Sequence, residues 1–460
     1  MRPTLFWYCL LTAAATVTVS TARADDWPQW LGPKRDGVWR ESGIVEKFPA
    51  GGPKVLWRTP IGGGYAGPAV ANGRVYVMDR QLGEGVKNPA DPFAKGKTTG
   101  VERVLCLNAE DGKQIWKHDY ECFYDIAYPS GPRCTPTVHQ GKVYTLGAMG
   151  DLHCLDATSG KVNWSKSFAK DYQAQPAQWG WASHPLVDGN KVICIVGGKG
   201  TTAVAFDKDT GKEIWRALTS RDGGQGYDPP MIFEAGGKRQ LIIWVPESVN
   251  SLNPDTGDVY WTQHFCDPDG KPMTIKAGMT IATPRRSGDL LFLSCFYNGS
   301  LMLKFAADKP DATVVWRSTS DNEQPNKTDT LHAVMCTPWL QDGYIYGVCS
   351  YGELRCLKIE NGERLWQTRK ATTAAVRPVR WANAFIVPNG DRFFLANELG
   401  DLIIAKLTPR GYDDLDRVHL IEPTSATAGR NYVWSHPAFA NRRVYLRNDK
   451  EVICVSLAQE

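Results

Sequence analysis

A glycine followed four residues later by a tryptophan recurs five times along this chain. The pairs are Gly112/Trp116, Gly160/Trp164, Gly211/Trp215, Gly257/Trp261 and Gly362/Trp366. Trp57 and Trp316 belong to the same series without the glycine, and from Trp116 to Trp366 successive tryptophans lie 46–55 residues apart. A period of this size indicates a repeat architecture. The repeat constrains the fold more than any other feature, but it describes a scaffold rather than an activity.

Each repeat contains a hairpin turn of recognisable chemistry. In the segment LDATSGKVNW at 155–164, an apolar strand leads into Asp156 and Thr158, whose side chains can bond forward to backbone amides. Gly160 supplies the positive φ that a tight hairpin needs. The segments 205–215 and 251–261 repeat the pattern. Each unit is therefore expected to contain a Leu-rich strand, a turn and a strand that carries a tryptophan.

A second motif lies upstream in each unit and consists of a small or polar residue, a proline, an apolar residue, a turn and a β-branched run. Its copies are Gly67-Pro68, Thr135-Pro136, His184-Pro185, Pro229-Pro230, Thr283-Pro284, Thr337-Pro338 and His436-Pro437, with 381–386 as a copy without proline. The β-branched runs, such as 73–77 and 191–195, are typical of strands. Together the two motifs predict four short strands per unit, which is the pattern of a propeller blade.

We therefore predict an all-β fold, an eight-bladed β-propeller of four-stranded blades. The last unit lacks a tryptophan strand, whereas the segment 54–57 precedes the first proline strand and has no blade of its own. This N-terminal strand is expected to pair with residues 451–455, because completing the C-terminal blade closes the ring and leaves no open sheet edge. Eight blades use nearly all of residues 25–460, which we interpret as a single domain.

The first 24 residues have the pattern of an export signal. Arg2 is positive, residues 5–19 are apolar, and Ala22-Arg23-Ala24 has the small-x-small form of a cleavage site. Cys9 lies inside the apolar run and not after small residues, so lipid attachment is not expected. We predict cleavage after Ala24, a periplasmic or secreted protein, and no transmembrane segment in the mature chain. In an oxidising compartment, Cys122 and Cys134 are the best candidates for a disulfide.

The candidate binding residues lie three positions before each proline, at the entry to the innermost strands. Loops at one face of a propeller converge on its axis, so these side chains should meet at one mouth. The positions are Tyr65, Arg133, Ala182, Tyr227, Ile281, Met335 and Trp434, with Trp381 equivalent in the unit without proline and Trp181 adjacent. Ordinary packing of loop tips is the alternative. As a binding site we predict Tyr65, Arg133, Trp181, Tyr227, Trp381 and Trp434, since aromatic rings around one arginine suit an anionic or planar ligand.

Two histidines, His184 and His436, occupy the same repeat position in blades far apart around the ring. We expect them to be structural or to line the channel, and we predict no metal site there. The formal net charge is +4 over 460 residues without a basic block, so nucleic-acid binding is not indicated.

The two motifs together resemble the pyrroloquinoline-quinone (PQQ) type of repeat, most closely at 141–144 and 155–164. The segment 26–37 is similar to the N-terminus of exported planctomycete-type members of that family. The resemblance implies either a BamB-like, non-enzymatic scaffold or a quinoprotein dehydrogenase that holds PQQ and calcium on the axis. The chain departs from the dehydrogenases because it has no adjacent cysteine pair to cover the quinone, and no calcium-binding Glu, Asn and Asp can be matched.

The expected function is therefore binding. We predict an exported PQQ-like repeat propeller of the periplasm or cell envelope that binds a protein, polysaccharide or small ligand at the axial mouth, without a cofactor. The alternative is a PQQ-dependent dehydrogenase that oxidises alcohols or sugars with PQQ and calcium.

Overall fold

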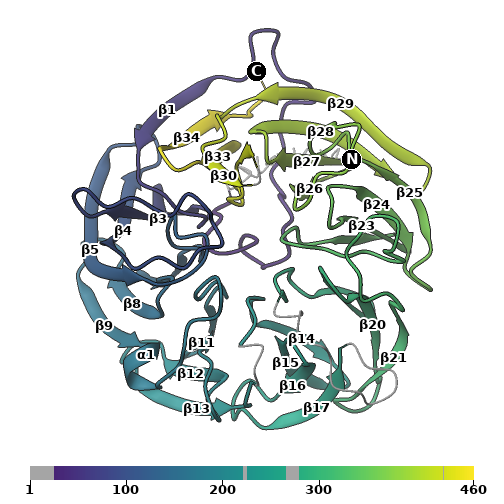
Figure 1. The fold of residues 1–460 in the computed structure, drawn as a ribbon, viewed down its shortest axis with the longest axis horizontal. Coiled ribbons are helices and arrows are strands. Elements are labelled where there is room, and N and C mark those ends of the chain that lie inside the picture. The colour runs from purple at the N-terminus through teal and green to yellow at the C-terminus, as the bar shows by residue number, and fades with distance from the viewer. Residues whose placement is uncertain (1–24, 221–224, 266–278, 428, 460) are drawn as a thin grey trace, which may run out of the picture.

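The computed structural model describes residues 25–220, 225–265, 279–427 and 429–459. Its strands form eight four-stranded antiparallel sheets arranged as a ring around a central axis (Figure 1). The predicted eight-bladed propeller is confirmed. Residues 1–24, which carry the predicted export signal, lie outside the described residues.

The first four blades follow the chain order, from the innermost strand to the outermost. They are β2 (Ala69–Ala71), β3 (Arg74–Leu82), β4 (Thr98–Asn108) and β5 (Gln114–Tyr124); β6 (Thr137–His139), β7 (Lys142–Leu146), β8 (Asp151–Asp156) and β9 (Val162–Ser167); β10 (Leu186–Asp188), β11 (Lys191–Ile195), β12 (Ala203–Asp207) and β13 (Glu213–Ala217); β14 (Met231–Ala235), β15 (Lys238–Val245), β16 (Ser248–Leu252) and β17 (Val259–His264). The short helix α1 (Phe168–Asp171) follows β9.

The remaining blades continue around the ring, and a small hairpin precedes the last one. They are β18 (Arg285–Ser287), β19 (Leu290–Cys295), β20 (Gly299–Phe305) and β21 (Ala312–Arg317); β22 (Trp339–Gln341), β23 (Tyr344–Val348), β24 (Leu354–Lys358) and β25 (Arg364–Thr368); β26 (Ala384–Asn389), β27 (Arg392–Asn397), β28 (Asp401–Thr408) and β29 (Gly411–His419); the hairpin β30 (Ser425–Thr427) and β31 (Arg430–Tyr432); and β32 (Ala438–Ala440), β33 (Arg443–Arg447) and β34 (Glu451–Ser456).

The ring closes through an N-terminal strand, as predicted. β1 (Val55–Pro60) pairs antiparallel with β34, with Trp57 opposite Cys454 and Pro60 opposite Glu451. It thereby supplies the fourth strand of the last blade (Figure 1). The first and last parts of the chain share one sheet, so the ring has no open edge at the closure.

The glycine–tryptophan repeat is an inter-blade contact. A Cβ added to Gly160 would lie 2.6 Å from the indole of Trp116 in the preceding blade, and Gly112 meets Trp57 in the same way. The Trp116 indole donates its hydrogen bond across the same boundary to the carbonyl of Ala157, at 3.1 Å. The glycine is therefore required because the tryptophan of one blade packs on the turn of the next.

One exception to this contact follows from the sequence. The turn of the fifth blade, at 306–311, lacks the glycine. Trp261, in the blade before it, directs its indole Nε1 to Gln240 Oε1 in its own sheet, at 2.7 Å.

An N-terminal segment crosses the ring, which the repeat did not predict (Figure 1). Its hydrogen bonds reach seven of the blades. We name residues 26–45 the strap. Trp27 pairs with Val70, the Pro28 carbonyl accepts from Val138, and Trp30 Nε1 donates to Thr283 Oγ1 at 2.9 Å. Arg35 reaches two further blades, as described below, and Trp39 and Val45 donate backbone hydrogen bonds to the carbonyls of Pro388 and Leu457. The strap thus ties together blades that are distant in sequence.

The candidate disulfide between Cys122 and Cys134 is not formed, because all cysteines in the described part of the chain are free and buried. Cys134 Sγ faces the carbonyls of Trp181 and Ser183, at 3.9 and 3.4 Å, and therefore packs between its own blade and the next. Within the described ranges, no helix is long and apolar enough to cross a bilayer.

Candidate functional site

A cavity of about 760 Å³ lies on the propeller axis, and every blade contributes to its wall. The eight residues three positions before each innermost-strand proline, or at the equivalent place, all line it. They are Tyr65, Arg133, Ala182, Tyr227, Ile281, Met335, Trp381 and Trp434. These residues occupy the same position in each repeat, just before the innermost strand. Because the innermost strands surround the axis, the eight side chains meet at one opening of the ring, the mouth. We call this cavity the axial pocket.

Trp181 is not among the lining residues. It is 1% exposed, its Nε1 donates to the Val196 carbonyl at 2.8 Å, and its ring packs on Phe168. The backbone bond from Trp181 to the Ala148 carbonyl holds it in the blade core. Trp179, two residues earlier, lines the pocket instead and contacts Tyr227 with ring centroids 5.3 Å apart.

Arg133 carries the formal charge of the pocket. Its guanidinium donates to the carbonyls of Gly131, Ala127 and Tyr128, the last at 2.6 Å, and lies 5.2 Å from the centre of the Tyr65 ring. Among the described lining residues there is no aspartate or glutamate. The carbonyls hold the guanidinium in place, and among the described residues no carboxylate forms an ion pair with it.

The Trp434 side of the mouth is held by a buried carboxylate. Glu398 is 1% exposed and accepts from Arg430 Nε at 2.8 Å and from Trp434 Nε1 at 3.0 Å. Tyr432, at the end of the β30–β31 hairpin, stacks on Trp434 with ring centroids 3.7 Å apart. These contacts fix the indole, and Trp434 is therefore a preorganised part of the wall.

A long loop of the first blade, residues 83–97, reaches the same mouth. Its Phe93 lines the pocket and lies between Tyr128 and Trp381, with ring centroids 5.0 and 5.5 Å away. Tyr128 and Trp381 both have left-handed backbone, with φ of 54° and 63°. Bulky side chains seldom adopt this conformation, and where it persists the surroundings impose it. Both strained residues therefore present their rings to the same phenylalanine.

The strap closes the opposite end of the pocket. The Trp30 indole stacks on His184 with ring centroids 4.0 Å apart and an interplanar angle of 9°, and it meets the edge of His436 at 4.8 Å. All three side chains line the pocket. The two histidines that the repeat placed at equivalent positions thus lie at one floor, and Trp30 fills the space between them.

A buried arginine lies close to this floor. Arg35 is 5% exposed and donates to the carbonyls of His184, Pro185 and Pro230, at 3.2–3.4 Å. Burial lowers its pKa to about 9. Burial, with the Arg35 charge as a smaller cause, lowers the pKa of His184 well below its usual value, and burial lowers the pKa of His436 to about 4. Both imidazoles are therefore neutral at pH 7.

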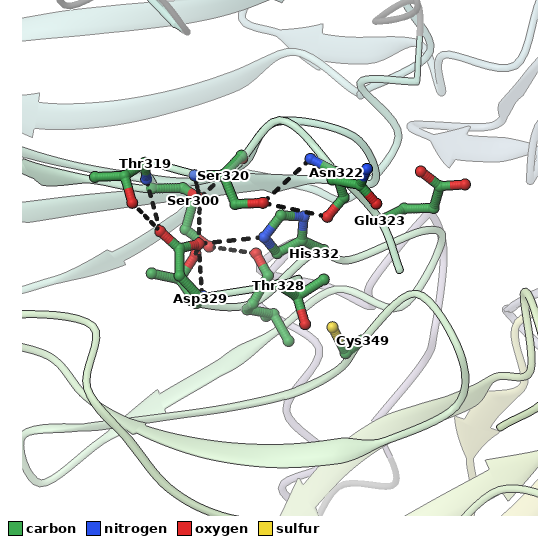
Figure 2. Close-up of polar contacts among 12 residues, drawn as sticks. Ser300, Thr319, Ser320, Asn322, Glu323, Thr328, Asp329, His332 and Cys349 are labelled. Carbon is green, nitrogen blue, oxygen red and sulfur yellow. Dashed lines mark hydrogen bonds and ion pairs between the residues drawn. The ribbon is translucent and has the colours of Figure 1, made fainter. Parts of the chain in front are cut away.

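A separate polar network lies around Asp329 and His332 (Figure 2). The Asp329 carboxylate accepts from the Thr319 amide at 2.6 Å, from Ser318 Oγ, and lies 3.3 Å from His332 Nε2, while His332 Nδ1 lies 3.2 Å from the Phe296 carbonyl. A catalytic triad needs a serine bonded to the histidine. Ser318 is bonded to the carboxylate instead, so this network fastens a loop and is not a nucleophile site.

The lining residues do not fit a calcium–quinone centre. Calcium takes six to eight oxygen ligands, usually with carboxylates among them. Within the described chain, the pocket wall offers amide oxygens from glutamines but no carboxylate, and no group of three or more His, Cys, Asp and Glu side chains is suited to a metal ion.

Sequence comparisons show that the chain is similar to two kinds of protein. A family model described as "Outer membrane protein assembly factor BamB" matches residues 100–368 and 245–460. The quinohemoprotein alcohol dehydrogenase ADH-IIG of Pseudomonas putida is 26% identical over 275 residues, covering 42% of this chain and 37% of that protein. BamB of Burkholderia pseudomallei is 25% identical over 237 residues, covering 51% and 54%. The chain thus spans about a third to a half of the length of these relatives.

Solved structures of both kinds share the fold. BamB from Moraxella catarrhalis has a TM-score of 0.51 at 15% identity, covering 84% of this chain and 99% of that one. The quinohemoprotein alcohol dehydrogenase from Comamonas testosteroni has a TM-score of 0.58 at 13% identity, covering 95% and 81%. At this identity the likeness extends to the propeller alone.

Proposed function

This chain belongs to the PQQ-type repeat family described as outer membrane protein assembly factor BamB, and on that premise we propose that it is a non-enzymatic binding protein of the periplasm or cell envelope. The proposal includes export after removal of residues 1–24 and a single propeller domain over 25–460. It assigns the axial pocket to a planar, negatively charged small ligand. The observation that carries this assignment is an aromatic wall whose formal charge comes from Arg133.

The shape of the pocket supports a small ligand over a protein chain or a polysaccharide. Its volume of about 760 Å³ lies in the range of small-molecule sites. Trp30 obstructs the axis at the floor, so a ligand enters and leaves by the mouth. A polymer threaded along the axis is disfavoured for the same reason.

The charge of the wall supports an anion. A cationic ligand would meet the Arg133 guanidinium without a carboxylate to compensate it, which in a partly desolvated site costs affinity. The faces of Tyr65, Trp381 and Trp434 offer stacking area for a flat ring. The aromatic residues and the arginine of the proposed site are those that the repeat pattern suggested, except that Trp179 takes the place of Trp181.

A quinoprotein dehydrogenase is the second candidate, favoured by the relatives named alcohol dehydrogenase. The lack of carboxylates in the described wall argues against it. The test is a titration with PQQ and Ca²⁺ followed by thermal unfolding. The binding proposal expects no rise in melting temperature and no reduction of an artificial electron acceptor by alcohols or sugars, whereas a ligand at 100 times its Kd would add about 2.7 kcal/mol of stability.

The binding proposal itself is tested with two probes of equal shape and opposite charge. We expect 2-naphthoate to quench tryptophan fluorescence and raise the melting temperature, and the 2-naphthylmethylammonium ion to do neither, because like charges repel at the wall. Arg133→Gln should remove most of the naphthoate affinity. Arg216→Gln is the control, since Arg216 is exposed on outer strand β13. Equal affinity for both probes, or binding unaffected by Arg133→Gln, contradicts the assignment.

A further inference from the structure

One repeat position inside the ring carries an acid in the fourth blade only. Two residues before each innermost-strand proline, or at the equivalent place, the other blades have an alanine, a cysteine or a serine, as at Cys134, Ser183 and Ala282. The fourth blade has Asp228 there. All of these side chains are buried, and Asp228 is only 2% exposed. Packing does not explain the acid, because a small uncharged residue fills the same place elsewhere in the ring.

The Asp228 carboxylate has no partner among the residues that the structure describes. Neither Oδ1 nor Oδ2 accepts a hydrogen bond from them, and the buried hydroxyl of Thr280 is also without a partner in the described ranges. An ionised carboxylate in a protein interior is strongly unfavourable unless another group compensates its charge. The surroundings of Asp228 therefore call for a counter-charge.

Three oxygen atoms converge at the place where Gly226 has no side chain. A Cβ added to Gly226 would lie 2.4 Å from Thr280 Oγ1, 3.2 Å from the Trp244 carbonyl oxygen and 3.6 Å from Asp228 Oδ1. The hydroxyl, the carbonyl and the carboxylate thus all lie within 3.6 Å of one point. We call these three groups the oxygen cradle. Gly226 also has a φ of 79°, so both its backbone and its surroundings disfavour a side chain there.

The oxygen cradle lies behind the wall of the axial pocket. Tyr227 and Ile281 line the pocket. Their chain neighbours Asp228 and Thr280 are buried and do not line it. The Tyr227 amide donates to the Thr280 carbonyl at 2.9 Å, which ties the two wall segments together. The cradle is therefore a second site, separate from the axial pocket, next to the segments that hold one side of the wall.

We propose that the oxygen cradle binds a monovalent alkali cation, Na⁺ or K⁺, through the Asp228 carboxylate, the Thr280 hydroxyl and the Trp244 carbonyl. Hard cations prefer such oxygen ligands, and water completes their coordination. One carboxylate balances one positive charge, whereas a divalent ion would leave a net positive charge buried. The inference is independent of the proposed function, because it concerns another site and another ligand.

Thermal unfolding in chloride salts of equal ionic strength tests the proposal. We expect NaCl or KCl to raise the melting temperature above its value in choline chloride and to saturate, since choline is too large for the cradle. Asp228→Asn keeps the shape without the charge and should abolish the rise. Thr280→Val removes one oxygen and should raise the half-saturating concentration by about 10-fold. Asp391→Asn, at an exposed ion pair with Lys406, is the control and should keep the full rise.

Rubidium gives a direct readout, because its anomalous scattering locates the ion in a soaked crystal. We expect a peak in contact with Asp228 and Thr280 in the wild-type protein and none in Asp228→Asn. Equal melting temperatures in all three salts, or a rise that Asp228→Asn retains, overturn the proposal. An infrared band of a protonated carboxyl group that persists in saturating NaCl and KCl and is lost in Asp228→Asn also overturns it, since a proton then replaces the cation. None of these outcomes affects the assignment of the axial pocket.

Discussion

At the scale of single residues, the repeated glycine and the repeated tryptophan form one contact that spans two blades. The glycine adopts a positive φ in the turn, and the space where its Cβ would be is occupied by the indole of the preceding blade. Two independent demands, backbone conformation and close approach, therefore select glycine at the same place. Some other turn glycines, such as Gly141, meet only the first demand.

This difference predicts unequal costs for the same substitution. Gly160→Ala should lower the free energy of unfolding by about 2–4 kcal/mol, because left-handed backbone and overlap with Trp116 add together. Gly141→Ala is the control: its φ of 76° is similar, but nothing lies within 4 Å of the added Cβ, so about 1 kcal/mol is expected. Urea unfolding measures both, and equal losses would contradict the packing explanation.

The buried histidines predict how stability depends on pH. The folded pKa of His436 is about 4, below the usual value of about 6.5 in the unfolded chain. The unfolded state then binds a proton that the folded state does not. Stability is full above pH 6.5 and is lost as the pH falls towards 4, by roughly 3 kcal/mol for one such group.

Thermal unfolding between pH 7.5 and 4.5 checks this dependence, with His436→Gln as the variant, and this range covers most of the window between the unfolded and the folded pKa of the histidine. We expect the variant to be less stable at pH 7.5 but to lose less stability on acidification. His184 and His153 have lowered pKa values as well, so part of the slope should remain. An unchanged slope would show that His436 titrates alike in both states.

At the scale of elements, one loop differs from the others around the mouth. Residues 83–97 connect β3 to β4 and place Phe93 against two residues with left-handed backbone from different blades. Other segments depart from the repeat as well, since residues 175–179, between β9 and β10, also line the pocket. The 83–97 loop is distinct because it lies inside one blade, between its second and third strands.

Removing the Phe93 ring should affect binding more than stability. Phe93→Ala should leave the melting temperature nearly unchanged, since the ring is 39% exposed, and should weaken 2-naphthoate by about 3- to 10-fold through faster dissociation. Leu82→Ala, at a position of equal exposure where β3 ends, is the control and should bind normally. Stopped-flow fluorescence separates the rates, and a slower association with unchanged dissociation would contradict this role.

At the scale of the whole molecule, two devices close the ring. β1 completes the last blade, and the strap joins seven blades across the axis. Arg35 is the strap residue that joins two neighbouring blades directly. Its buried guanidinium donates to carbonyls of both blades and has no carboxylate partner among the described residues. The same segment forms the pocket floor, so ring stability and ligand recognition are joined in the strap.

Two arginines of the strap therefore predict very different losses. Arg35→Ala should lower the free energy of unfolding by about 2–4 kcal/mol, because several buried carbonyls lose their donor. Arg40→Ala is the matched control, since Arg40 pairs with Asp36 at the surface, and it should cost less than about 1 kcal/mol. Calorimetry of both variants decides, and similar small losses would mean that the strap does not hold the ring.

What the sequence by itself determined is what repeats locally. The hairpin turns, the proline strands, the closing strand at 54–57 and the eight positions facing the mouth were all predicted, because each depends on contacts within one blade copied around the ring. Only the tertiary structure decided that Trp179 and not Trp181 lines the pocket, that Phe93 reaches Trp381, and that Trp30 fills the floor between two histidines. These contacts join segments far apart in the sequence, where burial and the available hydrogen-bond partners, and not any periodic pattern, determine where a side chain lies.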